Sequence, residues 1–185
     1  MGSAVVNVSL TFNLIKARCS FPLILLLRQL LLVLLLSFST LSYALTVHPA
    51  WLQQSLDKSD KLNDKNPSLA LDFTLEILAN PKEILNSQGK AALYSRIAEY
   101  SYFLDKIEQS QKYIDLFYKL ETDLTSRDGI SVLLVHAGLF EVQGKSKKAM
   151  ELYLQAKNNA EITENKKLLA DSYGAIASSF SENYN

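Results

Sequence analysis

Cysteine, histidine, glycine and proline are all scarce in this sequence. Of its 185 residues, one is cysteine, two are histidine, six are glycine and four are proline. The cysteine, Cys19, lies near the amino terminus, so the chain beyond it can form no disulfide within itself and has no thiol chemistry. Neither His48 nor His136 has a cysteine or a second histidine at metal-ligand spacing, so the sequence predicts no metal site.

Acidic residues are absent from residues 1–44, which carry three basic residues. This stretch contains the apolar run LLLVLLLSF, Leu30 to Phe38, and the small residues Ser42 and Ala44 follow it. A basic leading region, an apolar core and small residues before a cleavage point are typical of an export signal. We therefore expect a signal peptide cleaved after Ala44. The alternative is an uncleaved membrane anchor, which Arg28 opposes because it interrupts the longer apolar stretch.

Both alternatives export residues 45–185, because the basic residues stay on the cytoplasmic side of the membrane. Membrane association through an uncleaved anchor stays open. The exported part holds 16 basic and 19 acidic residues, a net charge of −3. This mildly acidic balance favours neither nucleic acid nor anionic lipid as a partner.

Strand patterns are also lacking beyond residue 44. Apolar residues recur three and four positions apart instead, as in residues 93–104 and 149–156. This spacing places apolar side chains on one face of a helix, so it predicts an all-α domain over residues 45–185. Asn66, which precedes a proline, is typical of a helix start, and Asp128 and Thr163 are predicted to cap later helices.

Two columns of small residues recur at a constant spacing. The first column is Ala98, Ala137 and Ala177, and the second is Ala70, Ser110 and Ala149, with steps of 39 or 40 residues. Small side chains let two helix backbones approach while bulky neighbours fill the gaps. The predicted unit is therefore a pair of antiparallel helices. Four units are expected, starting near residues 51, 91, 130 and 170; the first has Lys58 in a small-residue column, and the last is incomplete.

At this point the chain resembles the tetratricopeptide repeat family. The repeat that matches best supplies, in the family's order, Leu133, Ala137, Phe140, Gly144, Ala149, Tyr153 and Ala156. The resemblance implies a right-handed superhelical stack of helical hairpins. The period of 39 to 40 exceeds the family's usual length of about 34 and is nearer to that of HEAT-type helical repeats.

In this family the first helix of each hairpin lines a concave groove. Carried over by register, the resemblance places Ser95, Glu99, Tyr102, Leu134, Gly138, Glu141, Asp171 and Ser178 on the groove surface. It implies a non-catalytic module that binds a protein or peptide partner and needs no cofactor.

The layout of the chain adds a second resemblance. An export signal followed by such repeats is similar to the amino-terminal half of certain bacterial membrane signalling proteins. In those proteins periplasmic repeats precede a membrane helix and a cytoplasmic diguanylate cyclase or histidine kinase domain. We therefore expect a periplasmic sensory or interaction region, and we read the chain as a fragment of a larger protein. The alternative is a stand-alone periplasmic scaffold.

The stretch GLFEVQGKS, Gly138 to Ser146, comes close to a phosphate-binding loop. It has one residue too many between its glycines, and the residues before it have helical spacing rather than that of a buried strand. It is therefore predicted to be a turn between helices, in which Gly144 ends one helix and Ser146 caps the next. An enzyme such as a nucleotide hydrolase would depend on this stretch alone, so we expect no catalytic residue.

Overall fold

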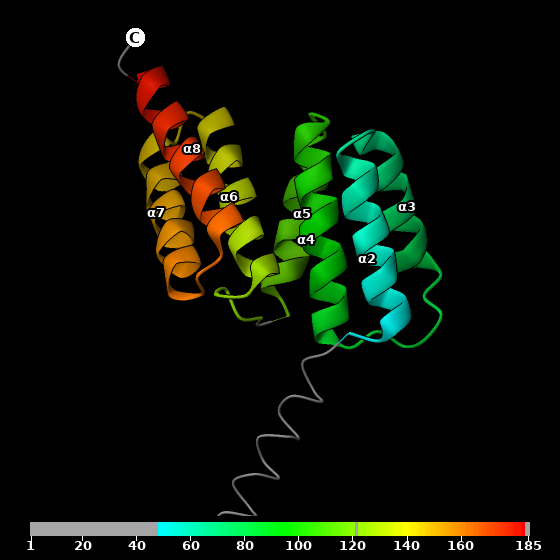
Figure 1. The fold of residues 1–185 in the computed structure, drawn as a ribbon. Coiled ribbons are helices and arrows are strands. Elements are labelled where there is room, and N and C mark those ends of the chain that lie inside the picture. The colour runs from blue at the N-terminus through cyan, green and yellow to red at the C-terminus, as the bar shows by residue number, and fades with distance from the viewer. Residues whose placement is uncertain (1–47, 121, 184–185) are drawn as a thin grey trace, which may run out of the picture. The chain divides into compact units, whose positions relative to one another are not determined.

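The computed structural model describes residues 48–120 and 122–183 (Figure 1), so the predicted signal peptide lies outside the described residues. Within them every regular element is a helix and no strand occurs, which agrees with the all-α prediction. The helices are α2 (Ala50–Asn63), α3 (Pro67–Ala79), α4 (Ser87–Phe103), α5 (Ile107–Tyr118), α6 (Arg127–Val142), α7 (Ser146–Ile162) and α8 (Lys166–Asn183).

Side-chain caps fix where four of the helices begin. The capping residues are Asn66, Asn86, Ser126 and Asn165, and each accepts a hydrogen bond from the backbone N–H three residues further on. The prediction for Asn66 is confirmed. Those for Asp128 and Thr163 are wrong, because Ser126 and Asn165 take these roles instead. Ser146 is the first residue of α7, and no side chain caps that helix.

Helices that are consecutive in the chain pack against each other as hairpins: α2 with α3, α4 with α5, and α6 with α7 (Figure 1). The first helices of these hairpins also contact one another in order, α2 with α4, α4 with α6, and α6 with α8. We call α2, α4, α6 and α8 the inner row. The candidate site lies on this row.

Small residues lie where the helices of a hairpin cross. Ser110 of α5 donates a hydrogen bond of 2.9 Å to the carbonyl oxygen of Ala98 in α4, and both residues are fully buried. Ala137 and Ala149 occupy one buried cluster between α6 and α7. Ala177 is different. It is exposed on α8, because no described helix crosses that face.

The first hairpin keeps the same crossing with a register one residue later than predicted. Ser59 is fully buried, and its Oγ lies 2.6 Å from Oγ1 of Thr74 on α3. Lys58 is exposed instead and holds its ammonium 4.4 Å from the centre of the Phe73 ring. Because Ser59 precedes Ala98 by 39 residues, the small-residue column extends into the first hairpin.

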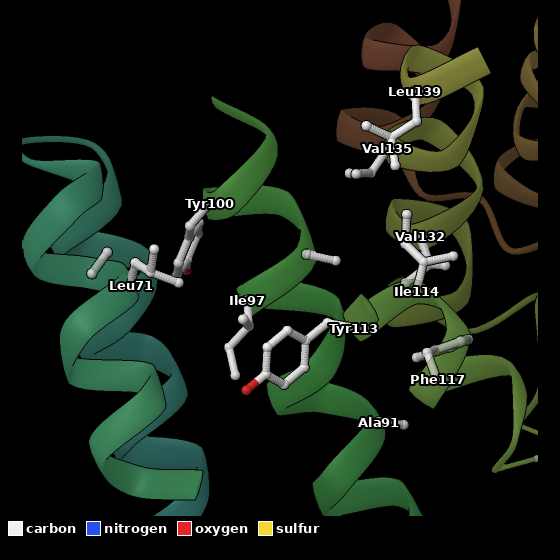
Figure 2. Close-up of a cluster of buried hydrophobic side chains, with 12 residues drawn as sticks. Leu71, Ala91, Ile97, Tyr100, Tyr113, Ile114, Phe117, Val132, Val135 and Leu139 are labelled. Atoms are coloured by element: carbon white, nitrogen blue, oxygen red, sulfur yellow. The ribbon is translucent and has the colours of Figure 1, made fainter. Parts of the chain in front are cut away.

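One cluster of buried apolar side chains extends over α3, α4, α5 and α6 (Figure 2). Leu71 of α3 lies beside Tyr100 of α4, while Ile114 of α5 and Val132 of α6 belong to the same cluster. Burying each such side chain stabilises the fold by about 1.5–3 kcal/mol. Because the hairpins share this core, neighbouring hairpins stabilise one another.

Residues with a left-handed backbone conformation form the tight turns after α4, α6 and α7. They are Asp105 (φ 57°), Gly144 (φ 70°) and Glu164 (φ 54°). In each turn the next N–H donates to a carbonyl five residues earlier, as Lys145 does to Phe140 at 2.8 Å. This bond satisfies a carbonyl that the helix end leaves open. The stretch GLFEVQGKS is thus the end of α6 and the turn to α7, and the prediction of an inter-helix turn at Gly144 is confirmed. The predicted cap is wrong, because Ser146 is the first residue of α7.

Two glycine-to-alanine substitutions test this turn. A Cβ at Gly144 or at Gly174 would meet no atom within 4 Å. The two sites differ in backbone conformation, since Gly144 is left-handed and Gly174 lies inside α8. We expect Gly144→Ala to lower the free energy of unfolding by about 1 kcal/mol and Gly174→Ala to raise it by about 0.5–1 kcal/mol. Urea titration followed by circular dichroism measures both. Effects of the same sign would contradict the assigned conformations.

Candidate functional site

One cavity on the inner row brings together most of the residues predicted to face a groove. It has a volume of about 610 Å³ and lies between α4, α6 and α8, with one residue from α7. Six of the eight predicted residues line it: Glu99, Tyr102, Leu134, Glu141, Asp171 and Ser178. We call this cavity the groove.

Gly138 and Ser95 do not line the groove. Gly138 lies beneath the ring of Tyr102, and a Cβ there would stand 2.5 Å from the Tyr102 hydroxyl oxygen. The glycine therefore lets the Tyr102 ring lie against α6. Ser95 is buried, and its hydroxyl donates to Asp128 at 3.1 Å. Ser95 therefore makes a polar contact between α4 and α6 instead of facing the groove.

Sequence reasoning missed several residues of the groove. Arg127, Ser131 and Ala175 line it from the inner row, and Tyr153 reaches it from α7. Ser131 lies one helical turn before the predicted Leu134, and Ala175 one turn before the predicted Ser178, so helical spacing could have found both. Tyr153, assigned to packing, is buried and also reaches the groove.

A buried arginine network joins three helices of the inner row beside the groove. Arg96 of α4 pairs with both carboxylate oxygens of Asp60 in α2, at 2.8 and 3.0 Å. Its other terminal nitrogen donates to Asp128 of α6 at 3.0 Å and to the backbone oxygen of Ala92. The Arg96 side chain is only 5% exposed. Such a bidentate, charge-assisted arrangement fixes geometry as well as supplying energy.

Hydroxyl groups and a second arginine extend this network. Tyr100 donates to Asp60 at 3.0 Å and receives a hydrogen bond from Ser59 at 3.2 Å. Arg127, at the start of α6 and on the groove wall, donates to Asp60 at 3.1 Å and lies 3.5 Å from Asp128. The positive charges of both arginines are therefore balanced by the two aspartates.

The network shifts the pKa of its members in opposite directions. Burial alone would raise the pKa of Asp60, but the hydrogen bond and charge of Arg96 outweigh it, and the pKa falls below its ordinary value of 3.8. Burial would likewise lower the pKa of Arg96, but Asp60 and Asp128 raise it. Burial raises the pKa of the Tyr100 hydroxyl. Both shifts favour the charged forms of Asp60 and Arg96.

Glu99 lies in the wall between the groove and a smaller cavity. This second cavity, of about 300 Å³, is bordered by α2 and shares Glu99, Arg127 and Lys167 with the groove. Glu99 accepts a hydrogen bond of 2.8 Å from Ser131. Burial raises the pKa of its carboxyl group in spite of that bond. The two cavities therefore give the inner row a hollowed surface from α2 to α8.

His136 contacts two aromatic side chains. His136 lies 3.2 Å from the Tyr118 hydroxyl and stacks on Phe140 at 4.6 Å between ring centres. Burial lowers the pKa of His136 and of His48. In the described part of the chain, no group of three or more histidine, cysteine or acidic residues could hold a metal ion.

Comparison with known proteins adds no assignment. No protein-family model, curated protein or solved structure matches the chain. Among the described helices, none is both long and apolar enough to cross a membrane.

Removal of the Asp60 carboxylate tests the arginine network. Asp60→Ala would leave Arg96 buried with one partner fewer, and we expect it to lower the free energy of unfolding at pH 7 by about 3 kcal/mol. The control is Asp57→Ala, one turn earlier on α2 and exposed, which we expect to cost less than about 0.5 kcal/mol. Urea unfolding of the full chain measures both. Equal effects would contradict a structural role for the network.

The destabilisation caused by the Asp60 substitution should also depend on pH. Because the folded-state pKa of Asp60 lies below its ordinary value of 3.8, its stabilisation is complete above that value and is lost as the pH falls through the folded pKa. The difference in the free energy of unfolding between wild type and Asp60→Ala should therefore be largest at pH 7 and should shrink below a pH of about 4. A difference that is independent of pH would show that packing, rather than charge, is lost.

Proposed function

We propose that residues 45–185 form an exported, non-catalytic binding module that holds a segment of another protein in the groove. The groove combines an apolar wall, Leu134, Leu168 and Ala175, with fixed polar groups such as Glu141 and Ser131. This combination is typical of recognition surfaces, in which apolar area supplies affinity and a few polar groups supply orientation. It is the observation on which the proposal depends.

The fold we propose is a tetratricopeptide-like solenoid, a right-handed stack of helical hairpins. Its support is the ordered packing of the inner row, the repeated small-residue crossings and the similar left-handed turns at Asp105 and Gly144. In such stacks each repeat packs on its neighbours, and the curved inner surface binds extended or helical segments. We further propose that the module is the periplasmic sensory region of a larger membrane signalling protein, which rests on the layout of the sequence alone.

A groove-blocking variant tests binding. Gly174 lines the groove, and a side chain built there meets open space. Gly174→Trp should therefore fill the groove without unfolding the chain. The full chain is used to select 12-residue peptides from a random displayed library, and affinities are measured by fluorescence anisotropy. We expect Gly174→Trp to weaken the selected peptides by at least about tenfold, the loss of roughly 1.4 kcal/mol.

The matched control is Ala177→Trp, on the same helix and exposed but outside the groove lining. It adds the same ring to α8 and should leave affinity unchanged. A second variant, Tyr102→Ala with Glu141→Ala, should weaken binding while circular dichroism confirms that the chain is folded. If no selected peptide distinguishes Gly174→Trp from Ala177→Trp, the groove is not the binding site.

A further inference from the structure

The directions of the helices locate one end of the groove. Successive contacts between α4 and α6 advance together along both helices: Arg96 with Asp128, Glu99 with Ser131, and then Tyr102 over Gly138. The two helices therefore run in the same direction, and their carboxyl ends lie at the same end of the groove. We call Tyr102, Phe103, Glu141 and Tyr153 the aromatic end; all four line the groove.

Three rings and one carboxylate line the aromatic end. The Tyr102 ring lies against the backbone of Gly138, and its centre is 5.9 Å from that of Phe103. Phe103 is 61% exposed, although it is a large apolar residue. Tyr153 donates a hydrogen bond of 2.8 Å to Glu141. This bond fixes the carboxylate beside Tyr153, in the same groove lining as the other two rings.

No lysine or arginine in the described chain pairs with Glu141. Of the three lysines that follow Glu141 most closely in sequence, Lys145 and Lys148 lie over the Phe140 ring, at 5.6 and 5.7 Å from its centre. A second tyrosine and glutamate with the same twelve-residue separation provides a comparison. There Tyr173 donates to Glu161, and Lys157 pairs with that carboxylate at 3.0 Å. Within residues 48–120 and 122–183, a lysine thus pairs with Glu161, and no lysine or arginine pairs with Glu141.

The other charged side chains of the groove also leave it with excess negative charge. Its carboxylates are Glu99, Glu141 and Asp171, and its cations are Arg127 and Lys167. Arg127 already pairs with aspartates of the arginine network. Lys167 is therefore the remaining cation against Glu141 and Asp171, even with buried Glu99 left out, so the groove lining carries a surplus of negative charge.

Resting on the function proposed above, we propose that the aromatic end seats a lysine or arginine side chain of the bound segment. The ammonium or guanidinium group would lie against Glu141 and among the rings of Tyr102, Phe103 and Tyr153. Carboxylates form charge-assisted hydrogen bonds with such cations, and aromatic faces attract them electrostatically. An acidic side chain at the same place would face an unpaired carboxylate. The occupant is therefore a basic segment of a partner protein.

The experiment uses the peptides selected on the full chain. It combines a substitution in the peptide with a substitution in the protein. In each peptide every lysine or arginine is changed to glutamine in turn, and Glu141→Gln is made in the protein. Glutamine keeps an acceptor for the Tyr153 hydroxyl while it removes the charge. We expect one basic residue of the peptide whose replacement weakens binding by about tenfold to wild type and by less than about twofold to Glu141→Gln.

Glu161→Gln is the matched control, because it removes a carboxylate from the other tyrosine and glutamate pair, outside the groove lining. It should leave the tenfold effect intact. Peptides that are sensitive to Gly174→Trp but lack a basic residue, or whose basic residue matters equally in Glu141→Gln, would overturn this inference and leave the binding function standing. If no peptide is sensitive to Gly174→Trp, the binding function fails, and the inference fails with it.

Discussion

The described fold depends on a charge that is taken out of water. Arg96 is almost fully buried, and burial of an unpaired guanidinium would cost far more than a small domain can offset. Asp60 and Asp128 must therefore approach it from the two neighbouring helices. Apolar contacts alone would tolerate sliding of one helix along another, whereas a bidentate ion pair does not. The network thus sets the register of α2, α4 and α6.

The register of these helices also positions the polar groups of the groove. Arg127 belongs both to the network and to the groove wall, and Glu99 is held by Ser131 one turn along the same pair of helices. The polar groups of the groove are therefore positioned before any partner arrives. A partner that binds to a preorganised surface loses less free energy in ordering it. The fixed positions of these polar groups support the recognition role proposed above over a role in packing alone.

The sequence predicted the helices, because apolar spacing along a helix is a local signal. The resemblance to a repeat family placed six side chains of the groove lining correctly, whereas other lining residues such as Arg127 and Ser131 were missed. Small residues at steps of 39 or 40 indicated the hairpin crossings, and Gly144 indicated a turn. Asp105 adopts the same left-handed conformation without being glycine, so composition did not reveal that turn. The roles of Ser95 and Arg96 could not be predicted, because their partners lie about 30 or more residues away. Side chains paired across helices leave no periodic signal in one sequence.

The width of the groove is controlled by a missing methyl group. At Gly138 the absence of a Cβ lets the Tyr102 ring lie against α6; with alanine, the ring would have to move away from that helix. Because Tyr102 lines the groove, such a displacement would change the shape of the groove. A position that does not line the groove therefore influences its shape, and a substitution at Gly138 would change the space that the groove offers.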